Sequence, residues 1–537
     1  MKNYLIYYLS ILLFASSFLY GDRGYFRQQQ ESTTHILDGF DSKTISTNTM
    51  SINLTNVNSL NWFIEGSYIG VEWLSGNNYL VFTHGLWLTG MADDSLIGTT
   101  SSWGLAYSPG PIIDGQAAMI AQPNDSTEYR IYHIDQNSGP GDSDYDEWPV
   151  HWGAPSNPDG SPKIYGDQTA FMIYNDAHPS VELRGLPESD ATPIEIHETV
   201  WSYDENVNLA VLDQTIFFRY QLFNRGSTDI NEASLALWTD LDIYHASANW
   251  GGYNTNGNYA YNYLYQDGYD GYIPRAIAYV LLQGPLAEQN GETGIAFGHQ
   301  YSDKTNLGTT ASWFIVDDSP PVGDGDILGV FPDELEQLRN ITLGLMPNGD
   351  PIVHPITGEI TPYTHDGNPA TGEGWLWAGG AGGGAGFVSS SSNYDLFSGD
   401  STEAIYAMVV ALGDSFSDAL VNLENQVMDL RDWWEENQLD IYDENYEQIP
   451  DSFELLNAYP NPFNPTTNIQ INVRSESDIS LQILDISGRT VETLLNGIVP
   501  MGRQDIQWNP QNHASGIYFI HLTSKHKSQS KKIVYLK

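Results

Sequence analysis

The sequence predicts a mainly β protein, with a large β-sandwich-type body, one amphipathic helix near the end of that body, and a small separate β-sandwich at the C-terminus. Aromatic residues make up 12% of the 537 residues, glycines number 50, and only 17% of the residues are charged. Aromatic side chains favour strands and glycine supplies tight turns, so we expect strands joined by turns and few long helices. A chain of this length is also too long for one ordinary core, which indicates two or three domains.

Charge is divided unequally along the chain. Residues 1–451 carry 13 Lys and Arg against 62 Asp and Glu, a balance of −49, whereas residues 452–537 carry 8 against 6, a balance of +2. The acidic field of the first part disfavours nucleic acid and anionic membrane surfaces as partners, and it favours cations and solubility. The chain contains no Cys, which excludes disulfides, thiolate metal sites and a thiol nucleophile.

Residues 1–21 are typical of a cleaved export signal. Lys2 precedes the apolar run Tyr4–Tyr20, and small residues follow near its end. A retained membrane anchor is the alternative, because the run lies near the lower length limit for spanning a bilayer. No second apolar run of this length occurs, so we expect no membrane span in the mature chain. Residues 22–50 are polar and are expected to be poorly ordered or to form an edge segment.

The acidic β-rich body is expected at residues 51–439, and its first strands form a hairpin. Residues 69–73 and 79–82 are apolar strand segments separated by the turn residues 75–78. The stretch 141–176 carries Gly, Pro and Asp so densely that it predicts ordered turns and no helix.

The strongest strand pair is predicted at residues 216–223 and 233–242. Apolar and aromatic residues occupy both faces of the first strand, which is typical of an internal strand in a packed sandwich. Asn224–Ser227 supplies a turn, so the two strands are expected to pair across it. Two more apolar strands follow at 276–282 and 404–412.

One amphipathic helix is predicted at residues 417–437. Leu420, Leu423, Val427, Leu430 and Trp434 recur at helical spacing, and acidic residues take the other face. This apolar stripe is expected to pack against the body. Ser417 is placed to cap the N-terminus of the helix. Residues 440–451 are acidic and form the expected linker to the last domain.

Alternating carboxylates are the candidate metal ligands. Asp142, Asp144 and Asp146 alternate in the loop-rich stretch, and Asp240 and Asp242 form a second alternating pair. Hard oxygen ligands at this spacing are how calcium loops gather carboxylates around one ion. The EF-hand pattern is not met. The sequence therefore leaves two alternatives, a structural calcium or a solvated acidic turn, and it indicates no other cofactor.

No catalytic motif is found in the body, and whether it is an enzyme stays open. His197-Glu198 begins like the zinc-protease signature, but Trp201 stands where the second histidine is required. Glycoside hydrolysis needs two carboxylates across a cleft. The candidate carboxylates are Glu195, Glu198, Asp240 and Asp242. We expect an extracellular binding or structural module. Glycan is a candidate ligand because Trp and Tyr stack on sugar faces, and calcium is a candidate because of the alternating carboxylates. A secreted hydrolase acting on polysaccharide is the alternative.

Residues 452–537 begin differently, with Pro460-Asn461-Pro462-Phe463-Asn464-Pro465. Three prolines in six residues fix φ and remove backbone donors, so we expect an extended arm that is poor in hydrogen bonds. Alternating strands follow at 469–473 and 479–483. After them come a turn at Gly488, a strand that contains Gly516 and Tyr518, and a basic last strand with Lys531 and Lys532.

This ordered pattern resembles, over its whole length, the C-terminal sorting domain (type A, Por-type) of type IX secretion cargo. The resemblance implies an immunoglobulin-like β-sandwich and a partner in the outer-membrane secretion machinery. It also implies a protein that is secreted from a Gram-negative bacterium or attached to its outer surface. The residues that match the sorting motif are Pro460, Asn461, Pro462, Phe463, Asn464, Pro465, Gly488, Gly516, Tyr518, Lys531 and Lys532.

The body resembles, from about residue 80 to about residue 440, a family of uncharacterised large secreted bacterial proteins that carry the same tail. The matching pieces include Gly85–Trp87, Gly166–Thr169 and Trp238–Asp242. As far as the resemblance carries, this family has no established activity. Many members continue after the paired Asp with further acids, whereas this chain has Ile243–Ser247, which weakens a cation site carried over from the family.

Overall fold

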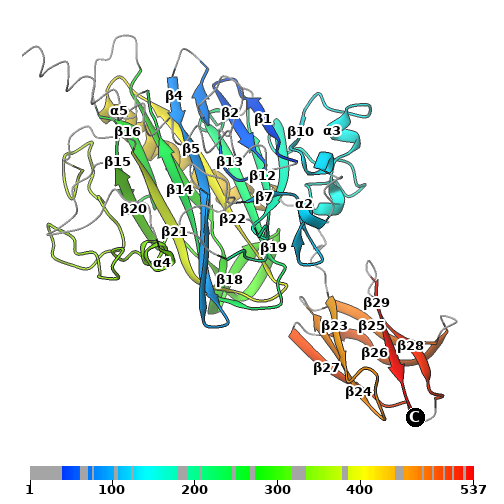
Figure 1. Ribbon diagram of the computed structural model, residues 1–537. Helices are drawn as coiled ribbons and strands as arrows, with labels where there is room; N and C mark the ends of the chain where they lie inside the picture. The colour runs from blue at the N-terminus through cyan, green and yellow to red at the C-terminus, as the bar shows by residue number, and fades with distance from the viewer. Residues whose placement is uncertain are drawn as a thin grey trace, which may run out of the picture. The chain divides into compact units, whose positions relative to one another are not determined.

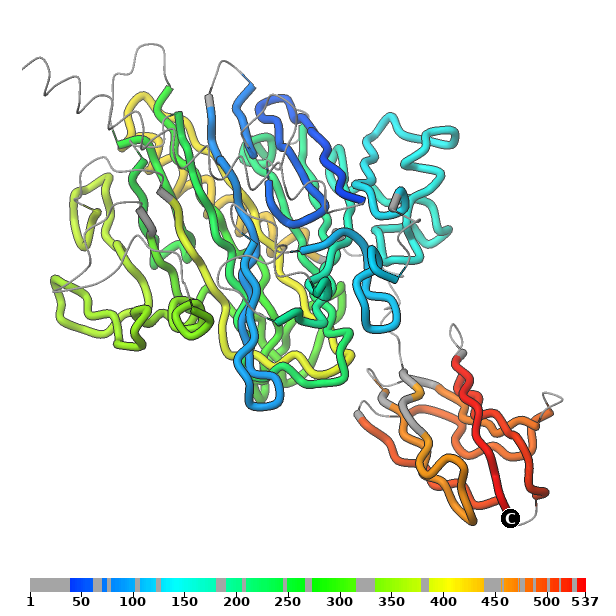
Figure 2. The backbone as a smooth tube through the Cα atoms, in the orientation of Figure 1, coloured from blue at the N-terminus to red at the C-terminus, as the bar shows by residue number. Residues whose placement is uncertain are grey.

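The computed structural model divides the chain into two compact units, Met1–Asp443 and Glu444–Lys537 (Figures 1 and 2). The structure describes residues 39–60, 70–74, 78–101, 107–121, 126–179, 190–204, 209–244, 249–265, 273–316, 334–377, 385–441, 453–473, 477–485, 489–499, 502–510, 513–523 and 528–537. The expected export signal at residues 1–21 lies outside the described residues.

The first unit is built on a nine-stranded antiparallel sheet with the order β10-β11-β12-β13-β22-β17-β16-β15, in which β7 also pairs with β11 (Figure 1). Its strands are β7 (Ser108–Pro109), β10 (Tyr132–Asp135), β11 (Gln168–Asn175), β12 (Ile194–Ser202), β13 (Thr215–Asn224), β15 (Asn249–Asn254), β16 (Tyr259–Leu264), β17 (Arg275–Gln283) and β22 (Ser401–Leu412).

A five-stranded sheet with the order β20-β21-β14-β5-β6 forms the second layer. Its strands are β5 (Thr83–Ala92), β6 (Ser95–Thr100), β14 (Ile230–Leu241), β20 (Ala311–Val316) and β21 (Ala385–Leu396). A four-stranded sheet contains β1 (Ser42–Ser46), β2 (Met50–Thr55), β3 (Val71–Trp73) and β4 (Asn78–Val81). Two small hairpins complete the strands of this unit: β8 (Ile112–Ile113) with β9 (Gln116–Ala117), and β18 (Leu286–Ala296) with β19 (His299–Asn306).

Strand alternation places one core between the sheets and one on each outer face. On β13, Ile216 and Phe218 point into the core shared with the five-stranded and four-stranded sheets. Phe217 points the other way, into the core under α5 (Phe416–Ile441). Apolar residues on both faces of β13 are therefore both buried, and the predicted internal strand of a packed sandwich is confirmed.

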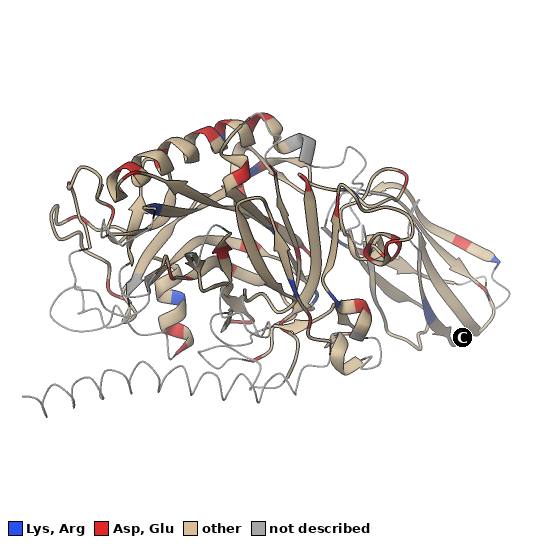
Figure 3. Ribbon diagram, turned by 90° about the horizontal axis from the view of Figure 1, so that it is seen from above, with Lys and Arg blue, Asp and Glu red and all other residues tan. Residues whose placement is uncertain are grey.

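The predicted amphipathic helix is α5, which lies across the outer face of the nine-stranded sheet (Figures 1 and 3). Leu423, Val427 and Leu430 are fully buried against the sheet, while acidic residues, red in Figure 3, occupy exposed positions of the helix. The expected cap at Ser417 is wrong. The Oγ of Ser415 accepts the backbone N–H of Asp418 at 3.1 Å and donates to its carboxylate at 2.9 Å, so the chain caps the helix two residues earlier.

In the part of the chain that the structure describes, the helices other than α5 are short. They are α2 (Ala118–Ala121), α3 (Ser143–Asp146) and α4 (Leu335–Thr342), with 3₁₀ turns η1 (Ser126–Tyr129), η2 (Val150–Trp152) and η4 (Leu212–Gln214). The expectation of turns without helix in the stretch 141–176 is wrong at α3, which is one turn long, and at strand β11 (Gln168–Asn175). α4 is a further helix that the sequence did not predict, and its Leu338 and Ile341 pack on the outer face of the five-stranded sheet.

One pairing differs from the sequence prediction. The strands at 216–223 and 233–242 do not pair, because β13 lies between β12 and β22, whereas β14 lies between β21 and β5 in the other layer. The turn at Asn224–Ser227 therefore carries the chain from one sheet to the other. The expected hairpin of β3 and β4 is confirmed. Of the polar segment 22–50, residues 42–46 form the edge strand β1.

The second unit is a β-sandwich of its own. A sheet with the order β23-β24-β27 packs against one with the order β26-β25-β28-β29 around a separate core. Its strands are β23 (Phe453–Tyr459), β24 (Thr467–Val473), β25 (Ser477–Leu484), β26 (Thr490–Val499), β27 (Gly502–Trp508), β28 (Gly516–Thr523) and β29 (Ser528–Tyr535). The mainly β class and the alternating strands at 469–473 and 479–483 are confirmed, since their alternate apolar residues fill this core. α5 ends at Ile441, inside the segment expected as a linker.

Candidate functional site

One buried aromatic side chain holds the proline-rich arm of the C-terminal unit. Phe463 is only 2% exposed. Its ring centroid lies 5.4 Å from that of Trp508 and 5.1 Å from that of Tyr535. Its backbone N–H donates to the carbonyl of Val534 at 3.0 Å, and its carbonyl accepts from Leu536 at 3.0 Å. The arm bends on either side of Phe463 and is hydrogen-bonded to the last strand, so the expectation of an extended arm that is poor in hydrogen bonds is wrong.

Asn461 supplies pairing that the neighbouring prolines cannot. Its Nδ2 donates to the carbonyl of Lys532 at 3.0 Å, and its Oδ1 accepts the N–H of Val534 at 2.8 Å. A side-chain amide can donate and accept at once, whereas proline has no N–H to give. The hydroxyl of Thr467 also donates to the carbonyl of Pro460 at 2.8 Å. The motif thus clamps the arm to β29.

The motif residues outside the arm that the structure describes lie on β28 and β29. Tyr518 is buried, whereas Lys531 and Lys532 are exposed on the last strand. Gly516 opens β28. In the arm, Pro460, Asn461, Pro462, Asn464 and Pro465 are exposed. Gly488 lies outside the described residues. The structure therefore joins the two ends of the motif, about 70 residues apart in the chain, on one edge of the sandwich.

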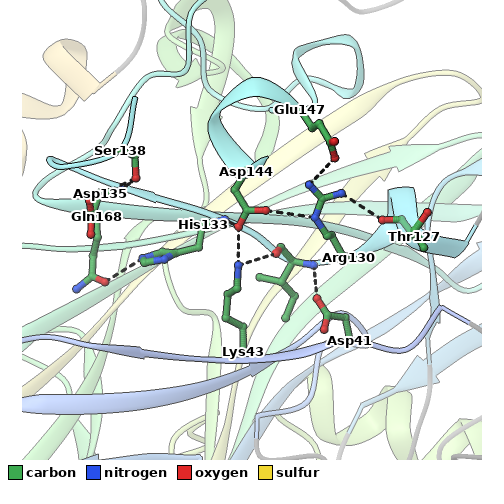
Figure 4. A network of polar contacts seen from close by, with 11 residues as sticks. Asp41, Lys43, Thr127, Arg130, His133, Asp135, Ser138, Asp144, Glu147 and Gln168 are labelled. Atoms are coloured by element: carbon green, nitrogen blue, oxygen red, sulfur yellow. Dashed lines mark hydrogen bonds and ion pairs between the residues drawn. The ribbon is translucent and has the colours of Figure 1, made fainter. Parts of the chain in front are cut away.

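Asp144 in the body is the centre of a polar network (Figure 4). Its carboxylate accepts from Lys43 Nζ at 2.6 Å, from Arg130 Nε at 3.2 Å and from the backbone N–H of His133 at 3.1 Å. Burial raises the pKa of Asp144, but the hydrogen bond and charge of Lys43 outweigh it, so the pKa is lowered. Arg130 also contacts Glu147 at 2.9 Å. Two basic side chains thus neutralise the central residue of the predicted calcium loop.

The other candidate ligands are placed apart from this network. Asp142 accepts the N–H of Gly139 at 2.8 Å, and Asp146 accepts the N–H of Gly141 at 3.1 Å and 3.2 Å. Asp240 lies near the end of β14, and Asp242 follows that strand. Within the ranges that the structure describes, no three His, Asp or Glu side chains gather in a group that could hold a metal ion. Calcium binding at either candidate site stays a prediction.

If calcium binds the loop, adding it to the purified full chain should raise the Tm, because a ligand that binds only the folded state stabilises it. Chelator should reverse the rise, and Asp146→Asn should reduce it. Asp159→Asn, an exposed carboxylate outside the loop, is the matched control. A Tm that does not change with calcium or chelator would remove the prediction.

Glu195 and Glu198, two candidate catalytic carboxylates, lie on opposite faces of β12. Glu198 points into the core between the sheets, where it accepts from Tyr174 OH at 2.9 Å. Glu195 points to the other face, where it contacts Arg225 Nη2 at 2.6 Å and His197 Nε2 at 2.8 Å. Both are 3% exposed or less. Two buried carboxylates on opposite faces of a sheet cannot flank one substrate, so this pair does not form a glycosidase site.

The surroundings of Glu198 and Glu195 shift the pKa values of these two residues in opposite directions. Burial raises the pKa of Glu198 to about 7 against the opposing hydrogen bonds from Tyr174, Tyr220 and Asn58. Burial acts in the same sense on Glu195, but the charge of Arg225 and the hydrogen bond from His197 outweigh it and lower its pKa to about 2. Glu195 is therefore an ion-paired carboxylate at neutral pH, whereas Glu198 titrates there.

A second buried ion pair stands on the same face as Glu195. Arg219 Nη2 lies 2.7 Å from Glu403 Oε2 across β13 and β22. Glu403 also accepts from Gln283 Nε2 at 2.7 Å and from the N–H of Phe297 at 2.6 Å. Three strands and the turn between β18 and β19 therefore meet at one carboxylate. Sequence reasoning missed this pair, although Arg219 within an otherwise apolar strand was the available sign.

A stacked aromatic pair lies at the β15 edge of the nine-stranded sheet. The rings of Trp250 and Tyr265 are 3.8 Å apart and inclined by 4°. Both side chains are partly exposed. Trp250 also packs against the buried pair Phe314 and Trp377. The two rings form a rigid, partly exposed aromatic stack, and exposed aromatic rings are the groups on which sugar rings stack.

The comparisons with known proteins agree with the motif of the C-terminal unit. Residues 457–536 match the family model described as a secretion system C-terminal sorting domain. A search of curated proteins finds no match. No helix in the described ranges is long and apolar enough to cross a membrane.

Three solved structures show low similarity to the chain. A polysaccharide lyase is 6% identical, with 68% of this chain and 39% of that chain covered and a TM-score of 0.18. The adhesin domain of Epf from Streptococcus pyogenes is 5% identical, with 68% and 90% covered and a TM-score of 0.13. PorZ, a surface component of the type IX secretion system of Porphyromonas gingivalis, is 12% identical, with 93% and 59% covered and a TM-score of 0.13. These scores are too low to support an argument about fold or function.

The matched family and the clamp of its motif on β29 lead to one conclusion. Residues 457–536 form a type IX secretion C-terminal sorting domain, and the chain is a cargo of that system that is secreted or attached to the outer cell surface.

Proposed function

We propose that the acidic body is the extracellular working part of this cargo and acts there as a glycan-binding module. The stacked pair Trp250 and Tyr265 carries the proposal, because a partly exposed aromatic plane offers stacking without any catalytic group. Export supplies the location, since the sorting domain addresses the body to the cell exterior.

Binding is favoured over hydrolysis by the placement of the acids. Glu195 and Glu198 are buried on opposite faces of β12, and neither reaches the aromatic pair through a contact in the structure. The exposed surface is acidic, which favours neutral over acidic polysaccharides as ligands because like charges repel.

We expect the purified full chain to bind neutral polysaccharides on a glycan array without releasing sugar from the same polymers. Tyr265→Ala should abolish the binding, since it removes one ring of the stack. Tyr79→Ala, an exposed tyrosine on β4, should leave binding unchanged. Sugar release that Asp240→Asn abolishes would instead support the hydrolase, and an array without any bound glycan would contradict the proposal.

A further inference from the structure

Six polar side chains in the core between the sheets are joined by hydrogen bonds into what we call the hydrogen-bond chain. Neither export nor glycan binding uses it. The six side chains come from the turn after β2 and from five strands, and all are buried. In the order of their hydrogen bonds, these residues are Asn58, Tyr174 (β11), Glu198 (β12), Tyr220 (β13), His84 (β5) and Tyr279 (β17).

The first half of the hydrogen-bond chain runs from the five-stranded sheet to the carboxyl group of Glu198. The N–H of Leu86 on β5 donates to Asn58 Oδ1 at 2.6 Å. Asn58 Nδ2 donates to Tyr174 OH at 2.7 Å, and Tyr174 OH donates to Glu198 Oε2 at 2.9 Å. Since the oxygen of Tyr174 accepts from Asn58, its own proton points at the carboxyl.

The second half returns from the carboxyl to the five-stranded sheet. Glu198 shares a hydrogen bond with Tyr220. Tyr220 OH lies 3.5 Å from His84 Nε2, and His84 Nδ1 lies 3.0 Å from Tyr279 OH. Burial lowers the pKa of His84 to about 3, so its ring is neutral and carries one N–H. With that N–H on Nδ1, Nε2 accepts from Tyr220, and the oxygen of Tyr220 then requires a donor. A protonated Glu198 supplies it.

Among the residues that the structure describes, no opposite charge is placed to stabilise an ionised Glu198. The titratable groups that share this interior with the chain are neutral tyrosines: Tyr107, Tyr394 and Tyr406. Two charged groups approach it from the strand ends. Asp176 is bound by the hydroxyl of Thr192 at 2.7 Å, and Arg275 lies over the ring of Trp73 at 5.2 Å. Arg275 precedes Tyr279 by four residues on β17, about 13 Å along a strand, and Arg219 faces the other side of the sheet.

We propose that Glu198 is a proton lock: the folded body keeps its carboxyl protonated near neutral pH, and loss of that proton at higher pH breaks the chain of hydrogen bonds that joins the two sheets. The carboxylate formed in this way would draw the protons of both Tyr174 and Tyr220, and His84 would lose its donor. An unpaired charge in this core is also costly.

The pH dependence of the stability that Glu198 provides follows from the direction in which its pKa is shifted. The pKa of Glu198 is about 7 in the folded chain against an ordinary 4.5, so an opened state releases the proton first as pH rises. The stabilisation is complete below pH 4.5 and declines as pH rises through the folded-state value. Above about pH 7 the loss is constant.

Native-state hydrogen exchange of the full chain tests the proposal. Glu198→Gln cannot ionise and keeps an N–H donor toward Tyr220, so it serves as the reference at each pH. The opening constant of β12 in the native chain should rise up to about 300-fold relative to Glu198→Gln between pH 4.5 and 7, since each pKa unit corresponds to a factor of ten. Glu195→Gln, on the opposite face of the same strand, should open β12 at neutral pH but retain this pH dependence.

Infrared spectroscopy provides a second readout that a merely structural glutamate would not give. At about pH 6 the native chain should show the carbonyl band of a protonated carboxylic acid, and Tyr220→Phe should alter the pH at which it disappears. Parallel exchange profiles of the native chain and Glu198→Gln would overturn the proposal. If Glu198→Gln does not fold, absence of the protonated band from the native chain at about pH 6 would overturn it as well.

Discussion

A chain that ends at residue 451 is expected to accumulate in the periplasm with its body folded. The sorting domain carries the address, and its core shares no residue with the cores of the body. Removing it therefore removes recognition by the secretion machinery without removing any residue of the body's own cores. Cell fractionation, with limited proteolysis of the retained chain, measures both parts of the prediction. Truncated chain in the medium would contradict the sorting role.

The same export step is expected to fail when only Phe463 is truncated. Phe463→Ala removes a ring that is 2% exposed and packs between Trp508 and Tyr535, so it should cost the domain about 3–5 kcal/mol. Tyr459→Ala is the matched control, because Tyr459 is an aromatic residue close by in the same segment but 80% exposed. Hydrogen exchange of β29 should rise in the first variant and not in the second. Equal export of both variants would show that the arm is not required in its clamped form.

The sorting domain was predictable because its information is local. Prolines, alternating apolar residues and basic residues in a fixed order specify an arm and its strands within a short stretch of chain. The partners of Phe463 were not predictable in this way. Trp508 and Tyr535 are ordinary aromatic residues in the sequence, and only the fold brings them to the arm.

In the body, strands were predictable but their neighbours were not. Alternation in β13 identifies a strand that is buried on both faces, yet it says nothing about the strand beside it. β13 pairs with β22, and the contact between Arg219 and Glu403 spans 184 residues of sequence. Asp144 likewise reads as a calcium ligand among nearby acids, whereas its partner Lys43 lies 101 residues earlier. Patterns within a short stretch of sequence predict whether the stretch is a strand. The ion pairs that its side chains form depend on residues far away in the sequence.

Glu403→Ala is expected to destabilise the body by about 3–5 kcal/mol, because it removes the carboxylate that forms a buried ion pair with the guanidinium of Arg219. Glu403 also receives hydrogen bonds from Gln283 and Phe297, so three buried donors lose their acceptor at once. Denaturant or thermal unfolding of the purified chain measures the loss. The control is Glu288→Ala in the exposed pair with Lys304, where we expect at most about 1 kcal/mol.

The double variant Arg219→Met/Glu403→Leu separates the cost of an orphaned charge from the value of the pair. If the penalty of Glu403→Ala comes from the uncompensated Arg219, the double variant should be more stable than the single one, since apolar groups of similar size fill the site without a buried charge. Gln283 and Phe297 would still lack their acceptor, so recovery should be incomplete. Full loss in the double variant would mean instead that the pair itself joins β13 to β22 and stabilises the folded sheet.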